Sequence, residues 1–422
     1  MRQGWSRRRF LGMAAAGWSL ERSQVLRAAP KAESMLGKVK IRDVQTASID
    51  IRYPAHLVKI TTDQGVFGIG EAFNGPGVLD NIQHLKRYLI GADPLQVDYL
   101  WTRMAEAISG HQGSKMGAIA GLEIALWDLA GKILKVPVYT LLGGKFRDKL
   151  LVYHDTGSPS TADPKPWVEE ALRSKEYGFK QMKFDLNWEG RAQGVMGKPY
   201  KYRREVWNRS ISPEELRQWV RIVEEILKAL GPGYDVAVDC HWEYSTRDVL
   251  RLAQAYEPLN IWFLEDPIPP DNADALARIT AATKTPIATG ENLDNRQQFR
   301  LFIEKQACDI IQPDPQRCGG LLETKRIADW ADLYYIPCAL HNMCTPVGSI
   351  ALGHLGAAMR SFLSLESDSI EIPYWKDLIV NDGGKFYKNG MLELPDGPGL
   401  GIELNEEVAK RHLAAGSKWF GA

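Results

Sequence analysis

Cysteine is scarce in this sequence, with five residues in 422, and no two of them have the spacing Cys-x-x-Cys. An odd number of thiols cannot all pair within one chain, and zinc sites built from paired Cys-x-x-Cys motifs are excluded. We therefore expect reduced packing residues at all five positions, which are Cys240, Cys308, Cys318, Cys338 and Cys344.

Net charge is also absent, because 52 basic residues balance 52 acidic ones. No basic excess attracts a polyanion, so nucleic acid is not an expected partner. No segment reaches the roughly 18–20 consecutive apolar residues of a membrane span. With 45% hydrophobic and 25% charged residues, the composition is that of a soluble globular protein. The length suits a barrel of about 250 residues and a second unit.

Residues 1–37 differ from the rest of the chain. They contain Ser6-Arg-Arg-Arg-Phe-Leu11 followed by a short stretch of small apolar residues. This pattern resembles a twin-arginine export signal, which predicts an exported, periplasmic protein. A basic leader on a cytoplasmic protein is the alternative that the sequence leaves open.

Two further changes of pattern divide the remaining chain. Residues 38–148 begin with alternating apolar and polar residues that turn at Gly65, and continue into helical segments, the strongest at 118–130. They predict an α+β domain. Residues 149–370 alternate short apolar runs with helical segments. Residues 371–422 contain a further hairpin pattern, too short to stand alone, which we expect to return to the N-terminal domain.

The runs in residues 149–370 predict a closed barrel. There are eight of them, and from Asp239 to Glu366 polar residues close successive runs at intervals of 23 to 27 residues. One strand, one helix and two loops of a (β/α)8 barrel have this length. The interval from Lys183 to Asp239 is 56 residues. We expect the excess, near residues 187–209, to form a substrate-contacting loop over the barrel mouth.

Asp239, Glu265 and Glu291 each close an apolar run and are spaced by 26 residues. Adjacent parallel strands would bring the three carboxylates together, where like charges repel unless a cation holds them. Mg²⁺ is the usual partner of a few carboxylates with open water positions. The sequence therefore predicts one Mg²⁺ site built from these three residues.

The sequence resembles the enolase superfamily, in its mandelate racemase subgroup. The resemblance rests on the ordered strand-end residues, on the segment Gly121-Leu-Glu-Ile-Ala-Leu-Trp-Asp-Leu-Ala-Gly131 and on Leu142-Gly-Gly144. The resemblance covers nearly everything after residue 38. It implies an α/β fold, namely a modified (β/α)8 TIM barrel with an N-terminal α+β capping domain that the C-terminal segment completes. It also implies removal of the proton alpha to a carboxylate, with Mg²⁺ stabilising the enediolate. Relatives commonly form homo-oligomers.

Candidate catalytic residues follow on the later strands. His341 and Asp314 close adjacent runs, so the aspartate can orient the imidazole as a general base, and they match the subgroup's His-Asp dyad. Lys183 matches the first lysine of the family's Lys-x-Lys motif and is a candidate contact for the substrate carboxylate. The second position of that motif is Asp185, a candidate substrate-binding residue, which disfavours a simple two-base racemase. Glu366 matches the family's eighth-strand acid, expected to hydrogen-bond the intermediate when protonated.

His241 lies two residues after Asp239 and should leave its strand on the same side. Asp-x-His at this place is similar to the acid-sugar dehydratases of the subgroup, galactonate dehydratases among them, where this histidine protonates the departing 3-hydroxyl. We therefore expect a lyase that removes water from a sugar acid, a small-molecule carboxylate, to give a 2-keto-3-deoxy acid. A racemase or epimerase of a 2-hydroxy acid and a non-catalytic exported sugar-acid binder are the alternatives. The sequence does not select the sugar.

Overall fold

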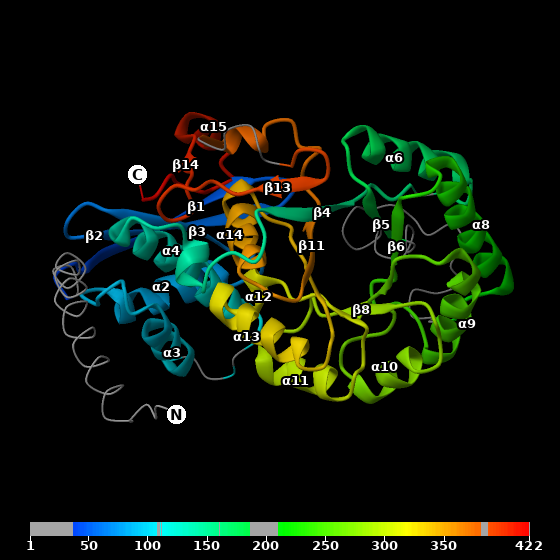
Figure 1. The fold of residues 1–422 in the computed structure, drawn as a ribbon. Coiled ribbons are helices and arrows are strands. Elements are labelled where there is room, and N and C mark those ends of the chain that lie inside the picture. The colour runs from blue at the N-terminus through cyan, green and yellow to red at the C-terminus, as the bar shows by residue number, and fades with distance from the viewer. Residues whose placement is uncertain are drawn as a thin grey trace, which may run out of the picture.

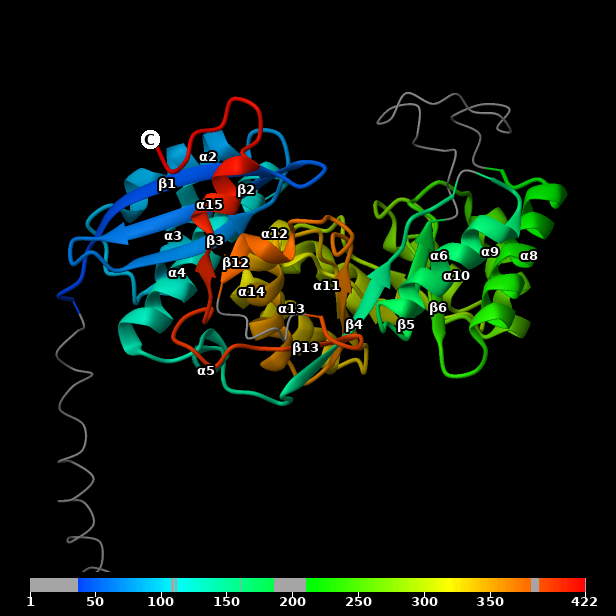
Figure 2. The same ribbon diagram turned by 90° about the horizontal axis from the view of Figure 1, so that it is seen from above.

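A computed structural model of the protein describes residues 37–107, 110, 112–159, 161–185, 210–380 and 387–421. Two units lie side by side in it, a sheet-and-helix domain at the N-terminus and a barrel (Figure 1). Viewed from above, the last part of the chain lies against the first domain (Figure 2). The predicted export motif and the predicted loop at 187–209 lie outside the described residues.

The capping domain is an antiparallel sheet covered by helices. Its sheet has the order β1 (Ile41–Asp50), β2 (Pro54–Thr62) and β3 (Phe67–Ala72). Gly65, at φ 79°, forms the turn between β2 and β3 where the sequence predicted it. The helices that follow are α2 (Val78–Leu89), α3 (Val97–Ala107), α4 (Ser114–Leu134) and α5 (Val138–Leu141). Helix α4 is buried nearly all round, because one side packs on β3 and the others face α2, α3 and the barrel.

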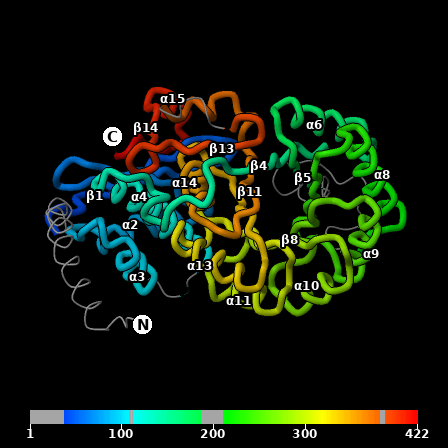
Figure 3. The backbone as a smooth tube through the Cα atoms, viewed as in Figure 1, coloured from blue at the N-terminus to red at the C-terminus, as the bar shows by residue number. Residues whose placement is uncertain are grey.

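Eight parallel strands close the barrel, as predicted, since β11 pairs with β4. Figure 3 shows the helices arranged around the outside of this ring. The strands are β4 (Lys149–Asp155), β5 (Gln181–Asp185), β6 (Asp235–Asp239), β7 (Leu264–Glu265), β8 (Ile287–Thr289), β9 (Ile310–Ile311), β10 (Cys338–Leu340) and β11 (Phe362–Ser367). The helices are α6 (Pro164–Glu176), α8 (Pro213–Leu230), α9 (Thr246–Tyr256), α10 (Ala273–Thr280), α11 (Arg296–Glu304), α12 (Pro315–Cys318), α13 (Leu321–Asp332) and α14 (Pro346–Ala357).

The C-terminal segment contacts both units. Strand β13 (Met391–Glu393) pairs antiparallel with β4 and so extends the barrel sheet, although the sequence predicted a return to the N-terminal domain. Leu413, later in the segment, forms an antiparallel bridge to Ile49 of β1. The later residues do reach the capping domain, where the Asp50 amide donates to the His412 carbonyl at 2.8 Å. Strand β14 (Glu403–Leu404), paired with β12 (Ile379–Val380), and helix α15 (Glu406–Arg411) complete the segment.

Two buried glutamates of the capping domain dock it onto helix N-termini of the barrel. Glu71 accepts hydrogen bonds from the amides of Thr345 at 2.9 Å and Gly348 at 3.0 Å, at the start of α14. Glu123 accepts from the amides of Leu321 at 2.8 Å and Leu322 at 2.9 Å, at the start of α13. Helix N-termini carry unpaired N–H groups and partial positive charge, which favours carboxylates. These contacts flank the strands that carry Asp314 and His341.

Glu123 makes the stability of this domain contact dependent on pH. Burial raises the pKa of Glu123 to about 7, against an ordinary value of 4.5. The folded protein therefore binds this proton more tightly than the unfolded chain, and stability falls as pH rises from 4.5 to 7. We expect the free energy of unfolding of Glu123→Gln, relative to that of wild type, to rise by about 3 kcal/mol as the pH rises from 4.5 to 7.

The measurement is the difference between the thermal or urea midpoints of the two proteins at each pH. Other titrating groups are shared and cancel in this difference. Glu224→Gln, on the exposed face of α8, is the matched control and should give a flat difference. A flat difference for Glu123→Gln as well would contradict the assignment.

All five cysteines are free and buried, in agreement with their expected packing role. Among the described residues, no helix has both the length and the apolarity to cross a membrane.

Candidate active site

Three strand-end carboxylates meet at one mouth of the barrel. Asp239 ends β6, Glu265 ends β7, and Glu291 follows β8 by two residues. One oxygen from each lies within 4.8 Å of the others, an arrangement that can hold a metal ion. Burial raises the pKa of Glu265 well above its ordinary value, and the charges of Asp239, Glu366 and Glu291 raise it further. An acidic cluster of this kind fits a divalent cation, the ligand that the carboxylate spacing predicted.

Lys183 lies beneath this cluster with its side chain only 2% exposed. Its Nζ is 2.9 Å from Glu265 Oε1 and 2.8 Å from Glu366 Oε1. Burial raises the pKa of Glu366, but Lys183 and His341 outweigh it and hold the pKa below its ordinary value. Glu366 is therefore ion-paired with Lys183 in this structure, and its expected role as a protonated acid toward the intermediate stays a prediction. Lys183 is likewise paired with protein carboxylates, and the substrate contact expected of it stays a prediction.

The predicted dyad is formed. His341 Nδ1 lies 2.9 Å from Asp314 Oδ2, and Asp314 Oδ1 accepts from the Gln316 amide at 2.7 Å, which fixes the carboxylate at the start of α12. His341 Nε2 points to the acidic cluster and lies 3.2 Å from Glu291 Oε2. Burial lowers the pKa of His341, but Glu291, Glu366 and Asp314 outweigh it and raise the pKa well above its ordinary value. An imidazole oriented in this way has one nitrogen available for proton transfer.

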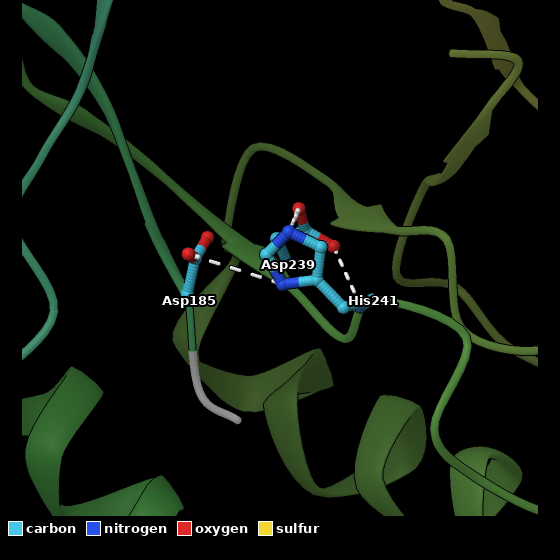
Figure 4. A group of neighbouring side chains, drawn as sticks. All are labelled: Asp185, Asp239 and His241. Carbon is cyan, nitrogen blue, oxygen red and sulfur yellow. Dashed lines mark hydrogen bonds and ion pairs between the residues drawn. The ribbon is translucent and has the colours of Figure 1, made fainter. Parts of the chain in front are cut away.

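His241 lies between Asp239 and Asp185 (Figure 4). Its Nε2 is 3.3 Å from Asp239 Oδ2 and its Nδ1 is 3.8 Å from Asp185 Oδ2. Burial lowers the pKa of His241, but Asp239 and Asp185 outweigh it and raise the pKa. These three residues are a second group whose atoms lie close enough to hold a metal ion. The structure thus brings all the predicted site residues to one mouth, with a histidine from β10 and another from β6.

Several buried polar residues at this mouth were not predicted. Gln312 donates from Nε2 to Glu265 Oε2 at 2.7 Å, and Thr289 donates to Asp266 Oδ1 at 2.5 Å. Asp155 ends β4, and burial raises its pKa well above its ordinary value. Gln312 had a usable signal, since it lies two residues before Asp314 on one extended segment and therefore faces the same side. Asp266 carried no such signal, because it directly follows Glu265 and the alternation of a strand points neighbouring residues to opposite sides.

Comparison with known proteins agrees with this geometry. Residues 167–408 match the family model described as enolase C-terminal domain-like. Residues 38–143 match the N-terminal domain of the mandelate racemase / muconate lactonizing enzyme family. The first match covers the barrel from helix α6 onward and the second covers most of the capping domain.

Similar individual proteins include two named dehydratases. D-xylonate dehydratase of Haloferax volcanii is 40% identical over 385 residues, 90% of each protein. D-galactonate dehydratase of Ralstonia pickettii is 31% identical over 374 residues, 86% of this chain and 92% of the relative. The crystal structure of a mandelate racemase/muconate lactonizing enzyme-like protein from Rubrobacter xylanophilus has a TM-score of 0.84 at 37% identity, covering 90% of this chain and 99% of that one. The chain therefore belongs to the mandelate racemase subgroup of the enolase superfamily, among its hydro-lyases.

Proposed function

We propose that the protein is a Mg²⁺-dependent dehydratase of an aldonate, a sugar acid with hydroxyls at C2 and C3. The observation that carries this proposal is the pair of histidines at different carboxylates of the acidic cluster, His341 at Glu291 and His241 at Asp239. Elimination of water needs both a base for the C2 proton and an acid for the departing hydroxyl, because hydroxide is a poor leaving group. The named relatives act on sugar acids of this class.

His341 is the proposed base. Its Nδ1 is held by Asp314, so Nε2 takes the proton from C2 of the substrate and the electron pair moves into the carboxylate as an enediolate. Lys183, paired with Glu265 and Glu366, places a fixed positive charge beneath the site where this second negative charge develops.

His241 is the proposed acid. As the enediolate collapses, the C3–O bond breaks and the hydroxyl leaves as water with a proton from His241. The enol product then tautomerises to a 2-keto-3-deoxy acid. Asp185, whose side chain is 28% exposed beside His241, is the proposed contact for a substrate hydroxyl. An aspartate here removes the second lysine that racemising relatives use as a base, which favours elimination.

Asp239, Glu265 and Glu291 would hold the metal ion. When bound, Mg²⁺ supplies a Lewis acid at the substrate carboxylate and so lowers the cost of forming the enediolate. Glu265 is fully buried and Asp239 is 1% exposed, so water does not screen the two carboxylates. Lys183 is shared with Glu366, so the cluster gains from a further positive charge.

The test is incubation of the purified protein with an aldonate library that begins with D-xylonate, D-galactonate and D-gluconate, in D2O with Mg²⁺, followed by mass spectrometry. We expect loss of one water from at least one aldonate, a halt on addition of a chelator, and recovery when Mg²⁺ is restored. Deuterium incorporation without loss of water would replace the dehydratase proposal with an epimerase. Binding without either change would indicate a sugar-acid binder.

Export through the twin-arginine pattern at residues 6–11, and assembly into a homo-oligomer, also remain proposals. The first rests on the sequence pattern and the second on the resemblance to the family.

A further inference from the structure

The loop that carries His241 has an unusual backbone. His241 and Trp242 have φ values of 45° and 60°, and Asp266, in the loop beside it, has φ 39°. Residues with a Cβ pay roughly 1–2 kcal/mol for this left-handed conformation, and such strain persists only where surrounding contacts fix it. None of the three is a glycine, so the neighbouring contacts must explain the conformation.

Asp266 supplies those contacts to Trp242. Its carbonyl accepts from the Trp242 amide at 2.7 Å, and its carboxylate Oδ2 accepts from the indole Nε1 of the same residue. Its other carboxylate oxygen accepts from the Thr289 hydroxyl at 2.5 Å. Asp266 and Thr289 are each only 1% exposed, so water does not compete for these bonds.

This bonding joins the loops after β6 and β7 to the end of β8. Trp242 follows the β6 ligand Asp239 by three residues, Asp266 directly follows Glu265, and Thr289 precedes Glu291 by two. The Trp242 ring meets the His241 ring edge to face, with centroids 5.5 Å apart and planes at 71°. Because Trp242 is held at both its backbone amide and its indole N–H, its ring packs against the His241 imidazole in a fixed position.

We infer that Trp242 is a positioning residue that holds His241 in place to protonate the departing hydroxyl. The two hydrogen bonds that Trp242 donates to Asp266, called the bracket below, hold Trp242 itself. This inference rests on the proposed dehydration. It separates the two half-reactions, because Trp242 and Asp266 belong to the loops after β6 and β7, whereas Asp314 and His341 follow β9 and β10. Losing the bracket should impair elimination and leave proton removal at C2 intact.

The test is Trp242→Phe, which keeps an aromatic ring but removes the indole N–H. For an aldonate that wild type dehydrates, we expect dehydration to fall about tenfold or more, within the range that general acid catalysis contributes. Deuterium exchange at C2 should stay within about twofold of wild type, since His341 supplies that step. The matched control is Trp167→Phe, which removes an indole N–H bonded to the Thr161 carbonyl at 2.9 Å, away from the acidic cluster. It should leave the ratio of the two rates unchanged.

Hydrogen exchange provides a readout that does not need activity. The backbone amide of residue 242 is hydrogen-bonded to the Asp266 carbonyl in wild type. It should exchange about tenfold faster in Trp242→Phe, equivalent to a loss of about 1.4 kcal/mol of protection. In Trp167→Phe it should exchange at the wild-type rate. Unchanged protection would overturn the bracket. Faster exchange with both reaction rates reduced equally would overturn the positioning role. If wild type dehydrates no aldonate, the proposed function fails, and the amide exchange still decides whether the bracket exists.

Discussion

Replacing His341 with asparagine should stop both half-reactions of the proposed chemistry. We expect dehydration to fall by about 10³-fold and deuterium exchange at C2 to fall equally, because removal of the C2 proton precedes every later step. The His341 imidazole is the group whose Nε2 faces the acidic cluster while Asp314 holds its other nitrogen. Asparagine cannot accept the proton. The measurement is the initial rate of each process on one substrate with saturating Mg²⁺.

The control for this variant removes another buried histidine. His56 lies in the capping sheet, 8% exposed, with its Nδ1 2.8 Å from the Ser48 hydroxyl. His56→Asn should lower stability and keep both rates near wild type. If His341→Asn kept its C2 exchange while losing dehydration, His341 would be the acid rather than the base, and the roles of the two histidines would have to be exchanged.

The barrel could be predicted because its signals are local. The runs at 181–185 and 287–289 coincide with β5 and β8, since a buried parallel strand is a short apolar run between loops. The apolar run at 261–265 is longer than the strand within it, since β7 is only Leu264–Glu265. Strand bounds depend on which neighbours pair, and this pairing is set by the closed barrel rather than by the run itself.

The acidic cluster and the dyad were predictable for a related reason. Strand ends recur at one mouth, so fixed intervals in sequence become proximity in space. The ion pairs of Lys183 and the bonds of Asp266 to Trp242 and Thr289 were not predictable, because they depend on side-chain reach across neighbouring strands. The lowered pKa of Glu366 follows from the same contacts. The sequence identifies the acidic residue, but its protonation depends on its neighbours in the fold.

Replacing His241 with asparagine should separate the half-reactions that the His341 variant stops together. We expect dehydration of the aldonate to fall by roughly 10²–10³-fold, because the hydroxyl then leaves without a proton donor, while C2 exchange stays near the wild-type rate. His241 is 19% exposed and lies beside Asp239, whereas His341 lies beside Glu291. The His241 backbone amide donates a hydrogen bond to Asp239 Oδ1 at 2.8 Å, and the substitution keeps this bond. The rates are measured by mass spectrometry at saturating Mg²⁺, so that any loss of metal affinity is compensated.

A substrate analogue makes this assignment sharper. In a 3-deoxy-3-fluoro aldonate the leaving group is fluoride, which departs without needing a proton, so the role of a general acid largely disappears. His241→Asn should therefore eliminate fluoride at close to the wild-type rate, whereas His341→Asn should not, because the C2 proton must still be removed. Slow fluoride elimination by His241→Asn would show that the residue acts before the leaving group departs, as a base or a binding group. That outcome would favour epimerisation, with His241 and His341 as opposed bases on the two faces of the substrate.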